Sequence, residues 1–321
     1  MWQKCSVFAA WLNNFDPFIF QIGGFGPRWY GLSYVVSALI GYRLYFRLAQ
    51  RGYTDIGPAR VADFITWIGL FGVLLGGRLG WILWYGRFQY HAPEDHVWWL
   101  RIWEGGMSSH GGILGIVVVT FILSRRWKVS WTSIGDSLCV VAPVGLFLVR
   151  CANFINGELF GNRTEVAWSV KFAAELRENV DALEAVGGNP ELAGDAERII
   201  TAAQHDPTLA TRLREVLPAR HPSQLYEALL EGVFLFVVLW LLRTRCRMPR
   251  GVLTGLFFIL YAAVRIFGEF FRVPDPAWSV GQFSAGQVLS FYMLGIGALF
   301  LGWGLWRRRY EVADEKPTAL V

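Results

Sequence analysis

Seven stretches of about twenty mostly apolar residues recur along this chain, and each is long enough to cross the hydrocarbon core of a bilayer. The composition agrees, because 54% of the 321 residues are hydrophobic and only 17% are charged, against roughly 25% in soluble domains. The pattern predicts an all-α integral membrane protein with a single membrane domain. The seven predicted spans are about 29–48, 61–84, 105–124, 133–156, 225–242, 252–271 and 286–306.

Basic residues gather in every second connection, which predicts the orientation of the spans. The positive-inside rule places these connections and the C-terminus in the cytoplasm, and the N-terminus outside. The net charge of +5 therefore belongs to membrane borders and does not indicate a nucleic-acid partner. The residues concerned are Arg43, Arg47, Arg51 and Arg60, then Arg125, Arg126 and Lys128, then Arg243, Arg245, Arg247 and Arg250, and finally Arg307, Arg308 and Arg309.

The longest external connection, 157–220, is predicted to form a helical extracytoplasmic head segment. Asn189 before Pro190 and Asp206 before Pro207 both resemble an N-cap followed by proline at the first helical position. Together with the Ala- and Glu-rich stretch near 172–186, they predict three short helices. Two interpretations remain open, a cover over an active site and a tolerated insertion.

Arg150 and Arg265 lie inside two of the predicted spans. A charge near the bilayer core costs several kcal/mol, so such residues normally face a cavity and serve a function. In the predicted topology both lie about seven residues, on the order of 10 Å, below the outer boundary. His110 and Arg78 fall in the same outer layer, with Tyr30 and Glu227 at the outer ends of their spans. This convergence predicts one site for an anionic lipid head group.

Each of these residues also has a purely structural interpretation. His110 could be an interfacial histidine with satisfied hydrogen bonds, and Arg78 could extend its charge to the surface. Arg150 and Arg265 could form structural ion pairs, for instance with Glu158 or Glu269. Asn153, Asn156 and Glu158 could only complete an unwound helix end, and the glycines after His110 permit close helix packing in any case.

The chemistry of these residue types suits transfer from a phospholipid. Arginine binds phosphate with two parallel hydrogen bonds and keeps its proton in an apolar cavity, while histidine can accept a proton near neutral pH. The four cysteines (Cys5, Cys139, Cys151 and Cys246) show neither a redox pair nor zinc-ligand spacing, so no metal and no cofactor are expected. The residues alone indicate an enzyme or a carrier that acts on an anionic lipid at the outer leaflet.

The motifs taken together resemble the bacterial prolipoprotein diacylglyceryl transferase family over nearly the whole chain. The family signature Gly-Arg-x-Gly-Asn-Phe-apolar-Asn-x-Glu-x-x-Gly matches 150–161, although Val149 and Ala152 stand where glycines are usual. Only about 171–217 is longer than the family usually carries. The other matching segments are Arg28 to Leu32, His110-Gly111-Gly112, His221 to Glu227, and Tyr261 to Asp275.

The resemblance implies transfer of the diacylglyceryl group of phosphatidylglycerol to the lipobox cysteine of a preprolipoprotein in the bacterial inner membrane. The product is a thioether, and glycerol phosphate leaves. His110 is then the candidate base, with Arg150 and Arg265 on the phosphate and Tyr261 and Glu269 orienting Arg265. Residues expected to bind the substrate are Tyr30, Arg78, Arg150, Asn153, Asn156, Glu158, Gly161 and Glu269.

Two points stay open at this stage. The substrate thiol could lose its proton to His110 or by an arginine-assisted route. The rival functions are a lipid or anion transporter that uses the same arginines, and a phospholipid-dependent transferase with another acceptor. A transporter would carry polar residues into the inner leaflet, and the spans have few there.

Overall fold

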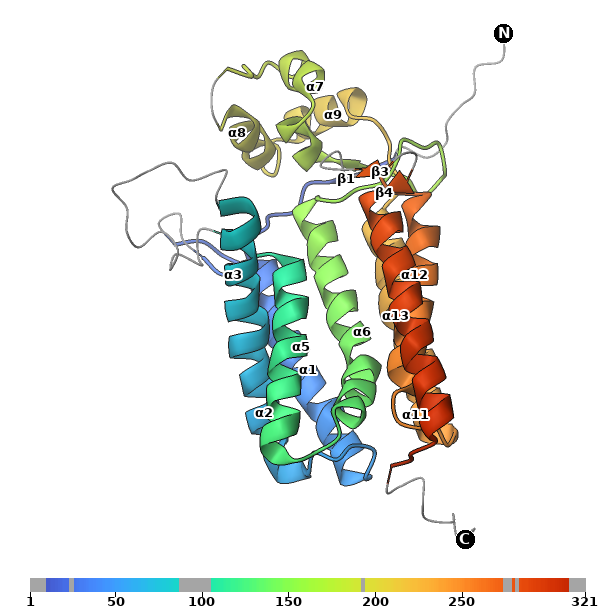
Figure 1. Ribbon diagram of the computed structural model, residues 1–321. Coiled ribbons are helices and arrows are strands. Elements are labelled where there is room, and N and C mark those ends of the chain that lie inside the picture. The colour runs from blue at the N-terminus through green and yellow to red at the C-terminus, as the bar shows by residue number, and fades with distance from the viewer. Residues whose placement is uncertain are drawn as a thin grey trace, which may run out of the picture. The chain divides into compact units, whose positions relative to one another are not determined.

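Apolar helices make up most of the computed structural model, which describes residues 10–22, 26–86, 105–191, 194–273, 279–280 and 283–311 (Figure 1). A helix occupies each of the seven segments predicted to span. The first helix is α1 (Trp29–Gln50), and the second runs without a break through η1 (Pro58–Arg60), α2 (Val61–Trp67), η2 (Ile68–Leu75), α3 (Gly76–Trp81) and η3 (Ile82–Gly86). The others are α5 (Ser109–Trp127), α6 (Trp131–Asn156), α10 (Ser223–Glu227) with η7 (Ala228–Phe234) and α11 (Leu235–Arg245), α12 (Val252–Glu269) and α13 (Ala285–Arg307).

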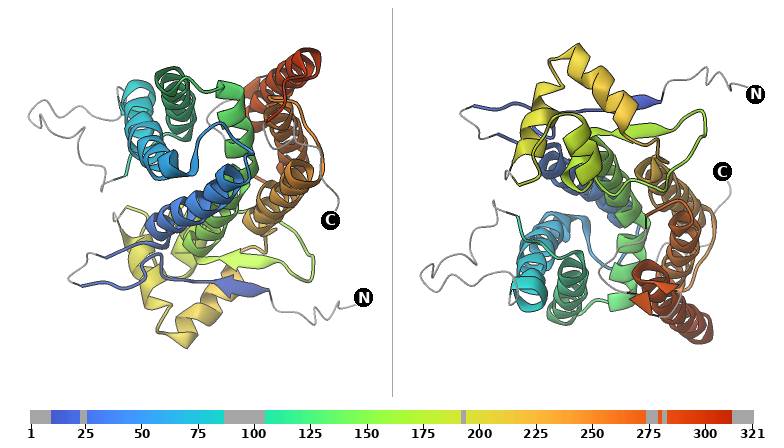
Figure 2. Two further views of the ribbon diagram at one scale, coloured as in Figure 1. Left: turned by 90° about the horizontal axis from the view of Figure 1, so that it is seen from below. Right: turned by 90° about the horizontal axis from the view of Figure 1, so that it is seen from above.

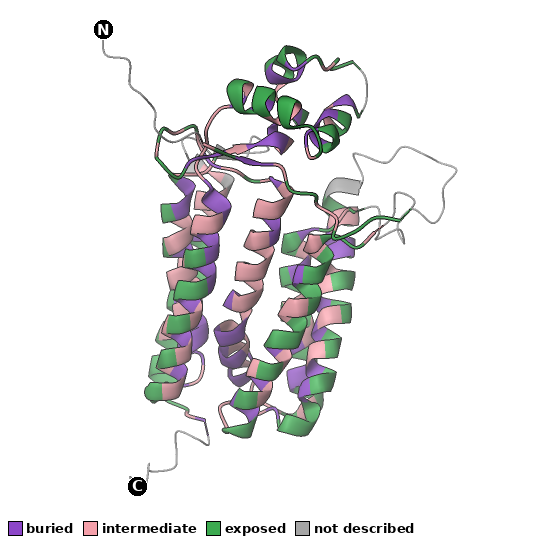
Figure 3. Cartoon of the chain, turned by 180° about the vertical axis from the view of Figure 1, so that it is seen from behind, coloured by how far each residue is buried: buried purple, intermediate pink, exposed green. Residues whose placement is uncertain are grey.

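Five helices in the described part of the chain are long and apolar enough to cross a membrane. Large apolar side chains are exposed along these helices, as Leu70, Leu74 and Leu299 illustrate (Figure 3). Exposed apolar side chains of this kind are suited to contact lipid. The five are Pro58–Trp84, Trp131–Asn156, Ser223–Arg245, Val252–Glu269 and Gly286–Arg307.

The chain divides into two compact units. The first contains Met1–Ser37, Pro143–Val238 and Phe258–Ile296, and the second contains Ala38–Ala142, Leu239–Phe257 and Gly297–Val321. The first unit holds the head segment and the C-terminal parts of α6 and α12, so it carries most of the predicted site residues.

The head segment of the first unit has its own apolar core. A short parallel pair joins β1 (Trp11–Asn13) to β2 (Val170–Phe172), so the N-terminal strand becomes part of the head (Figure 2). Leu12 from β1 packs with buried residues of the head, such as Leu176, Ile199 and Leu213. The head elements are η6 (Ala173–Arg177), α7 (Val180–Ala185), α8 (Asp195–Ala202) and α9 (Pro207–Val216).

One of the two predicted helix caps in the head is confirmed and the other is wrong. Asp206 caps α9, because its carboxylate accepts hydrogen bonds from the N–H groups of Thr208 and Leu209. No helix begins at Pro190. The Asn189 side chain instead accepts from the Glu191 N–H at 2.9 Å, which closes a local turn, and α8 begins only after Gly194.

Buried polar contacts hold the second unit together at its basic end. The Asp136 carboxylate accepts from the N–H groups of Gly251 and Thr254 and from the Thr254 hydroxyl. Arg250 forms ion pairs with Asp55 at 2.6 Å and Glu311 at 3.1 Å. Burial raises the pKa of Glu311 to about 7. These contacts join the loop after α1, the start of α12 and the segment after α13.

A short antiparallel pair, β3 (Ser279–Val280) and β4 (Phe283–Ser284), precedes α13. Part of one matched motif, Pro274 and Asp275, lies outside the described residues, as do Cys5 and the C-terminal residues 312–321. Cys139 and Cys151 lie in one helix, α6, as predicted.

Candidate functional site

Three arginines and three glutamates form a buried cluster in the first unit. Arg150 comes from the last two turns of α6, and Glu227 and Glu231 come from the helix formed by α10 and η7. Arg265 and Glu269 lie on α12, and Arg272 follows that helix directly. The charges of the six side chains balance. A buried set of charges is stable only when its members are paired in this way.

Arg150 bridges two carboxylates with three of its nitrogens. Its Nη1 lies 3.0 Å from Glu227 Oε2, and its Nε and Nη2 lie 3.1 and 3.0 Å from Glu231 Oε2. The Arg150 side chain is 14% exposed, whereas both glutamate side chains are 1% exposed. The guanidinium group is therefore fixed from one side, and the carboxylates beneath it are closed to solvent.

Arg265 joins the same two carboxylates from a different helix. Its Nη1 donates a short hydrogen bond to Glu227 Oε1 and lies 3.8 Å from Glu231 Oε1. Its Nη2 lies 3.3 Å from Glu269 Oε2, one helical turn further along α12. Arg272 adds a third guanidinium group, with Nη1 at 3.4 Å from Glu227 Oε1. Glu227 is thus the common partner of all three arginines.

These pairs decide between the ion-pair partners that the sequence suggested. Glu269 does hold Arg265, as predicted from their spacing of one turn. Glu158 does not pair with Arg150 among the contacts described, since Glu227 and Glu231 take that place.

Close backbone approach brings Glu231 to Arg150. Gly232 packs against Phe147 of α6 so tightly that a Cβ at position 232 would lie 2.5 Å from Phe147 Cβ and 2.9 Å from its Cα. Glu231 and Gly232 also lie in the π-helical stretch η7, and such stretches frequently mark functional sites. The local widening of this helix and the glycine together set the position of the carboxylate.

Amide side chains surround a second carboxylate at the end of α6. Asn153 donates to Glu158 Oε1 at 2.6 Å, and Asn156 donates to the same oxygen at 3.3 Å. Gly157 ends the helix with a φ of +69°, which turns the chain so that Glu158 folds back over the last turn. These contacts agree with the structural interpretation of this motif. They also place a carboxylate with two oriented amides at the end of α6, the helix that carries Arg150.

Gly161 is required by packing. A Cβ there would lie 2.3 Å from the Phe271 carbonyl oxygen and 2.7 Å from that of His221. Its N–H donates to the His221 carbonyl at 2.9 Å. The segment after α6 is thereby joined to the segments before α10 and after α12. Packing is therefore enough to explain why position 161 is a glycine. Its predicted role in substrate binding stays a prediction.

His221 belongs to this junction. Its Nδ1 lies 3.1 Å from the Tyr226 hydroxyl, and its ring meets Phe271 edge to face. Burial lowers the pKa of His221, so its ring is neutral at pH 7. These contacts suit a residue that fixes the loop geometry.

The remaining predicted residues of the first unit are Tyr30 and Tyr261. Tyr30 is the second residue of α1, and its hydroxyl accepts a long hydrogen bond of 3.5 Å from Tyr34. Tyr261 lies on α12, four residues before Arg265 and therefore on the same face of the helix.

His110 and Arg78 belong to the second unit. Arg78 is buried, donates from Nη1 to the carbonyls of Gly105 and Gly106 at 2.7 and 3.0 Å, and stacks over Trp81. It therefore does not extend to the surface. His110 is the second residue of α5 and is exposed.

The glycines that follow His110 differ in their packing. A Cβ at Gly111 would lie 2.4 Å from the Gly76 carbonyl oxygen, so this glycine allows α5 to approach α3. At Gly112 the nearest atom would be 3.8 Å away, which is ordinary van der Waals contact.

Two charged residues of the cluster were not predicted to take part, Glu231 and Arg272. Glu231 had a recognisable signal, because it is an acidic residue inside an apolar run and lies four residues after Glu227. Arg272 lies at the edge of its predicted span, where a basic residue is common and gives no signal.

The described residues contain no group of three or more His, Cys, Asp or Glu side chains that could hold a metal ion. Cys139, Cys151 and Cys246 are free thiols.

Together, apolar helices and a buried arginine–glutamate cluster define an α-helical membrane protein with a polar site between its helices. Comparison with known families matches residues 17–303 to the prolipoprotein diacylglyceryl transferase family. This chain belongs to that family, and it is a diacylglyceryl transferase.

Three relatives show how far the similarity extends. All are named phosphatidylglycerol–prolipoprotein diacylglyceryl transferase. The protein of Escherichia coli K12 is 39% identical over 295 residues, covering 90% of this chain and 93% of its own. Those of Sodalis glossinidius and Pseudoalteromonas atlantica are each 37% identical, over 90% and 93% of this chain and 93% and 92% of their own.

Proposed function

We propose that this chain transfers the diacylglyceryl group of phosphatidylglycerol to the lipobox cysteine of a preprolipoprotein. The observation that carries the proposal is the convergence of Arg150, Arg265 and Arg272 on buried carboxylates in a member of this family. An anionic phosphate needs cations that keep their protons in an apolar setting, and guanidinium groups meet that need.

The glutamates position the cations for this task. A guanidinium group has five N–H donors, and the contacts with Glu227, Glu231 and Glu269 hold each arginine in one orientation. Donors that are fixed in advance stabilise charge that develops on a leaving group without reorganising during the reaction. Here that leaving group is glycerol phosphate, which departs as its C–O bond to the diacylglyceryl carbon breaks.

The acceptor cysteine supplies the nucleophile. A thiol has a reference pKa near 8.5, so a base must help form the thiolate that attacks the diacylglyceryl carbon and forms the C–S bond. We assign this role to His110, whose exposed ring can reach a substrate. The amides of Asn153 and Asn156, with Tyr30 and Glu158, are assigned to the glycerol head group. Tyr261 is assigned to orienting Arg265 from the preceding turn of α12.

We further propose that all seven long helices cross the bacterial inner membrane, with the N-terminus and the head outside and the C-terminus in the cytoplasm. Besides the five apolar helices, α5 exposes a row of apolar residues that includes Ile113, Val117 and Phe121. The helix α1 likewise exposes Val35 and Leu39. The basic loops between alternate spans support the orientation.

One assay tests the proposed reaction. The purified protein is incubated with phosphatidylglycerol vesicles and a lipobox peptide, and mass spectrometry follows the peptide while glycerol phosphate is measured in solution. We expect equal amounts of diacylglyceryl-peptide and glycerol phosphate, and no product from a peptide with serine in place of the cysteine. Release of glycerol phosphate without peptide modification would point to another acceptor.

A further inference from the structure

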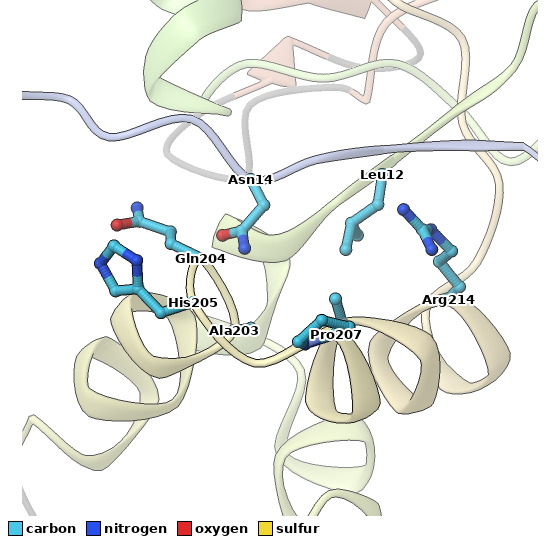
Figure 4. Close-up of a pocket in the computed structure, with 8 residues that line it drawn as sticks. Leu12, Asn14, Ala203, Gln204, His205, Pro207 and Arg214 are labelled. Atoms are coloured by element: carbon cyan, nitrogen blue, oxygen red, sulfur yellow. The ribbon is translucent and has the colours of Figure 1, made fainter.

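Two adjacent clefts lie between the N-terminal segment and the head helices, entirely within the first unit. Each has a volume of about 270 Å³, and they share Asn14, Gln204 and His205. Figure 4 shows the first cleft. The first is also lined by Leu12 and Arg214. The second extends to Ile155, Asn156 and Gly157, at the end of α6.

The walls of these clefts suit a polypeptide backbone. Side-chain amides from Asn13, Asn14, Gln21, Asn156 and Gln204 line the second cleft, and an amide can both donate to and accept from a peptide group. The Asn14 and Asn156 side-chain oxygens are buried and have no hydrogen-bond partner among the described residues. A donor from a bound chain that reaches either oxygen would supply the hydrogen bond that the described residues do not.

The charges of the second cleft do not suit an anionic lipid. The cationic Arg177 in the second cleft is paired with Glu197, at 3.2 Å between Nη2 and Oε2, and Asp16 also lines this cleft. A phosphate would meet this acid without an unpaired cation of the same cleft to offset it. An extended chain with few charges fits the lining better.

The helix α6 links the second cleft to the arginine cluster, because it carries both Asn156 and Arg150. Asn156 follows Arg150 by six residues on α6, which corresponds to about 9 Å along the helix. An extended chain advances about 3.3 Å per residue. A thiol at the level of Arg150 therefore places the third residue after the cysteine beside Asn156.

We infer that these clefts bind the few residues of the substrate that follow the lipobox cysteine. This inference rests on the proposed transferase function and adds a second recognition site to it. The volumes are at or below the lower end of small-molecule sites, so the clefts accept a short extended segment and not a folded domain. The inference also gives the head segment a role in substrate affinity.

Kinetics with two peptides tests the inference. One peptide ends one residue after the cysteine, and the other continues for eight further residues. We expect the longer peptide to have a KM about tenfold lower at similar kcat, because the added contacts form equally in the ground and transition states. Equal KM values for the two peptides would overturn the inference while leaving the transferase function intact. If neither peptide is modified, the proposed function itself fails.

A blocking variant sharpens the test. Gln204→Trp fills the shared part of the clefts, and we expect it to raise the KM of the long peptide to that of the short one without changing the short one. Thr208→Trp is the matched control, because Thr208 is exposed on the same head and lines neither cleft. An equal effect of Gln204→Trp on both peptides, or on the KM for phosphatidylglycerol, would contradict a peptide site.

Photo-crosslinking with the unmodified protein locates the bound peptide even if the Gln204→Trp variant does not fold. A photoreactive residue at the third position after the cysteine of the long peptide is activated in the unmodified protein. We expect crosslinks within 13–16 or 197–205. Crosslinks confined to other segments would show that the chain leaves the site by another route.

Discussion

A buried arginine depends on the carboxylates around it, and the cluster shows this at the level of single residues. Arg150 is held by Glu227 and Glu231, and both glutamates also meet Arg265. Arg150 and Arg265 could be predicted as a site because charge is rare inside an apolar span. Their partners could not be derived from the sequence, since pairing depends on how α6, η7 and α12 face one another.

Glu231→Gln should lower activity by about ten- to a hundredfold. The change keeps the size of the side chain but removes the charge that orients Arg150, and a charge-assisted contact is worth roughly 1.5–3 kcal/mol. The variant also leaves a positive charge in excess, so a lower thermal unfolding temperature in detergent is expected. Glu184→Gln is the control, because Glu184 is exposed on the head helix α7 and lines neither cleft. Equal effects of the two variants on turnover would argue against a positioning role.

His110→Asn should abolish transfer while the protein still binds phosphatidylglycerol. The asparagine keeps a polar group on α5 but cannot accept the thiol proton. Turnover with the lipobox peptide and binding of the lipid are measured on the same preparation. Near-normal turnover would mean that His110 is an interfacial residue and that the proton leaves by the arginine-assisted route.

At the level of elements, the length of the apolar runs was enough to predict the long helices. In the head, single residues such as asparagine before proline fit both a helix cap and a local turn. Helices occupy all the segments predicted as spans, and the Asp206 cap of α9 is confirmed. The Asn189 cap is wrong because Asn before Pro also favours a local turn, and here the side chain bonds two residues ahead. The close contacts at Gly111, Gly161 and Gly232 could not be predicted individually, since each depends on a partner far away in the sequence.

Gly111→Ala and Gly112→Ala should differ in stability although the residues are neighbours. A methyl group at 111 meets the Gly76 carbonyl oxygen at 2.4 Å, and one at 112 finds its nearest atom at 3.8 Å. Overpacking costs typically 1–3 kcal/mol, so only Gly111→Ala should unfold at a clearly lower temperature. Thermal unfolding in detergent measures the difference. Similar unfolding temperatures for both would show that α3 and α5 separate easily.

For the whole molecule, the proposed orientation in the membrane rests on the basic loops, and a cysteine of the chain can test it. Cys246 is an exposed thiol at the end of α11, on the side proposed to be cytoplasmic. In a chain with the other cysteines replaced by alanine, an impermeant maleimide should label Cys246 only after permeabilisation. A Thr211→Cys variant without Cys246 should be labelled in intact cells, because Thr211 lies on the head helix α9. Labelling of Cys246 in intact cells would contradict the proposed topology.

The most direct test of whether the cluster binds the phosphate of the lipid is the rate of diacylglyceryl transfer by lysine variants. The variants are Arg150→Lys, Arg265→Lys and the double variant. A lysine keeps the charge but lacks the planar fork that holds phosphate with two parallel hydrogen bonds. We expect each single variant to lose about ten- to a hundredfold in kcat/KM, and the double variant to lose less than the product, because both arginines act on one phosphate. Arg198→Lys, on an exposed head residue, should remain fully active. Near-normal rates for the single variants would contradict the account and reduce the cluster to a structural ion-pair network.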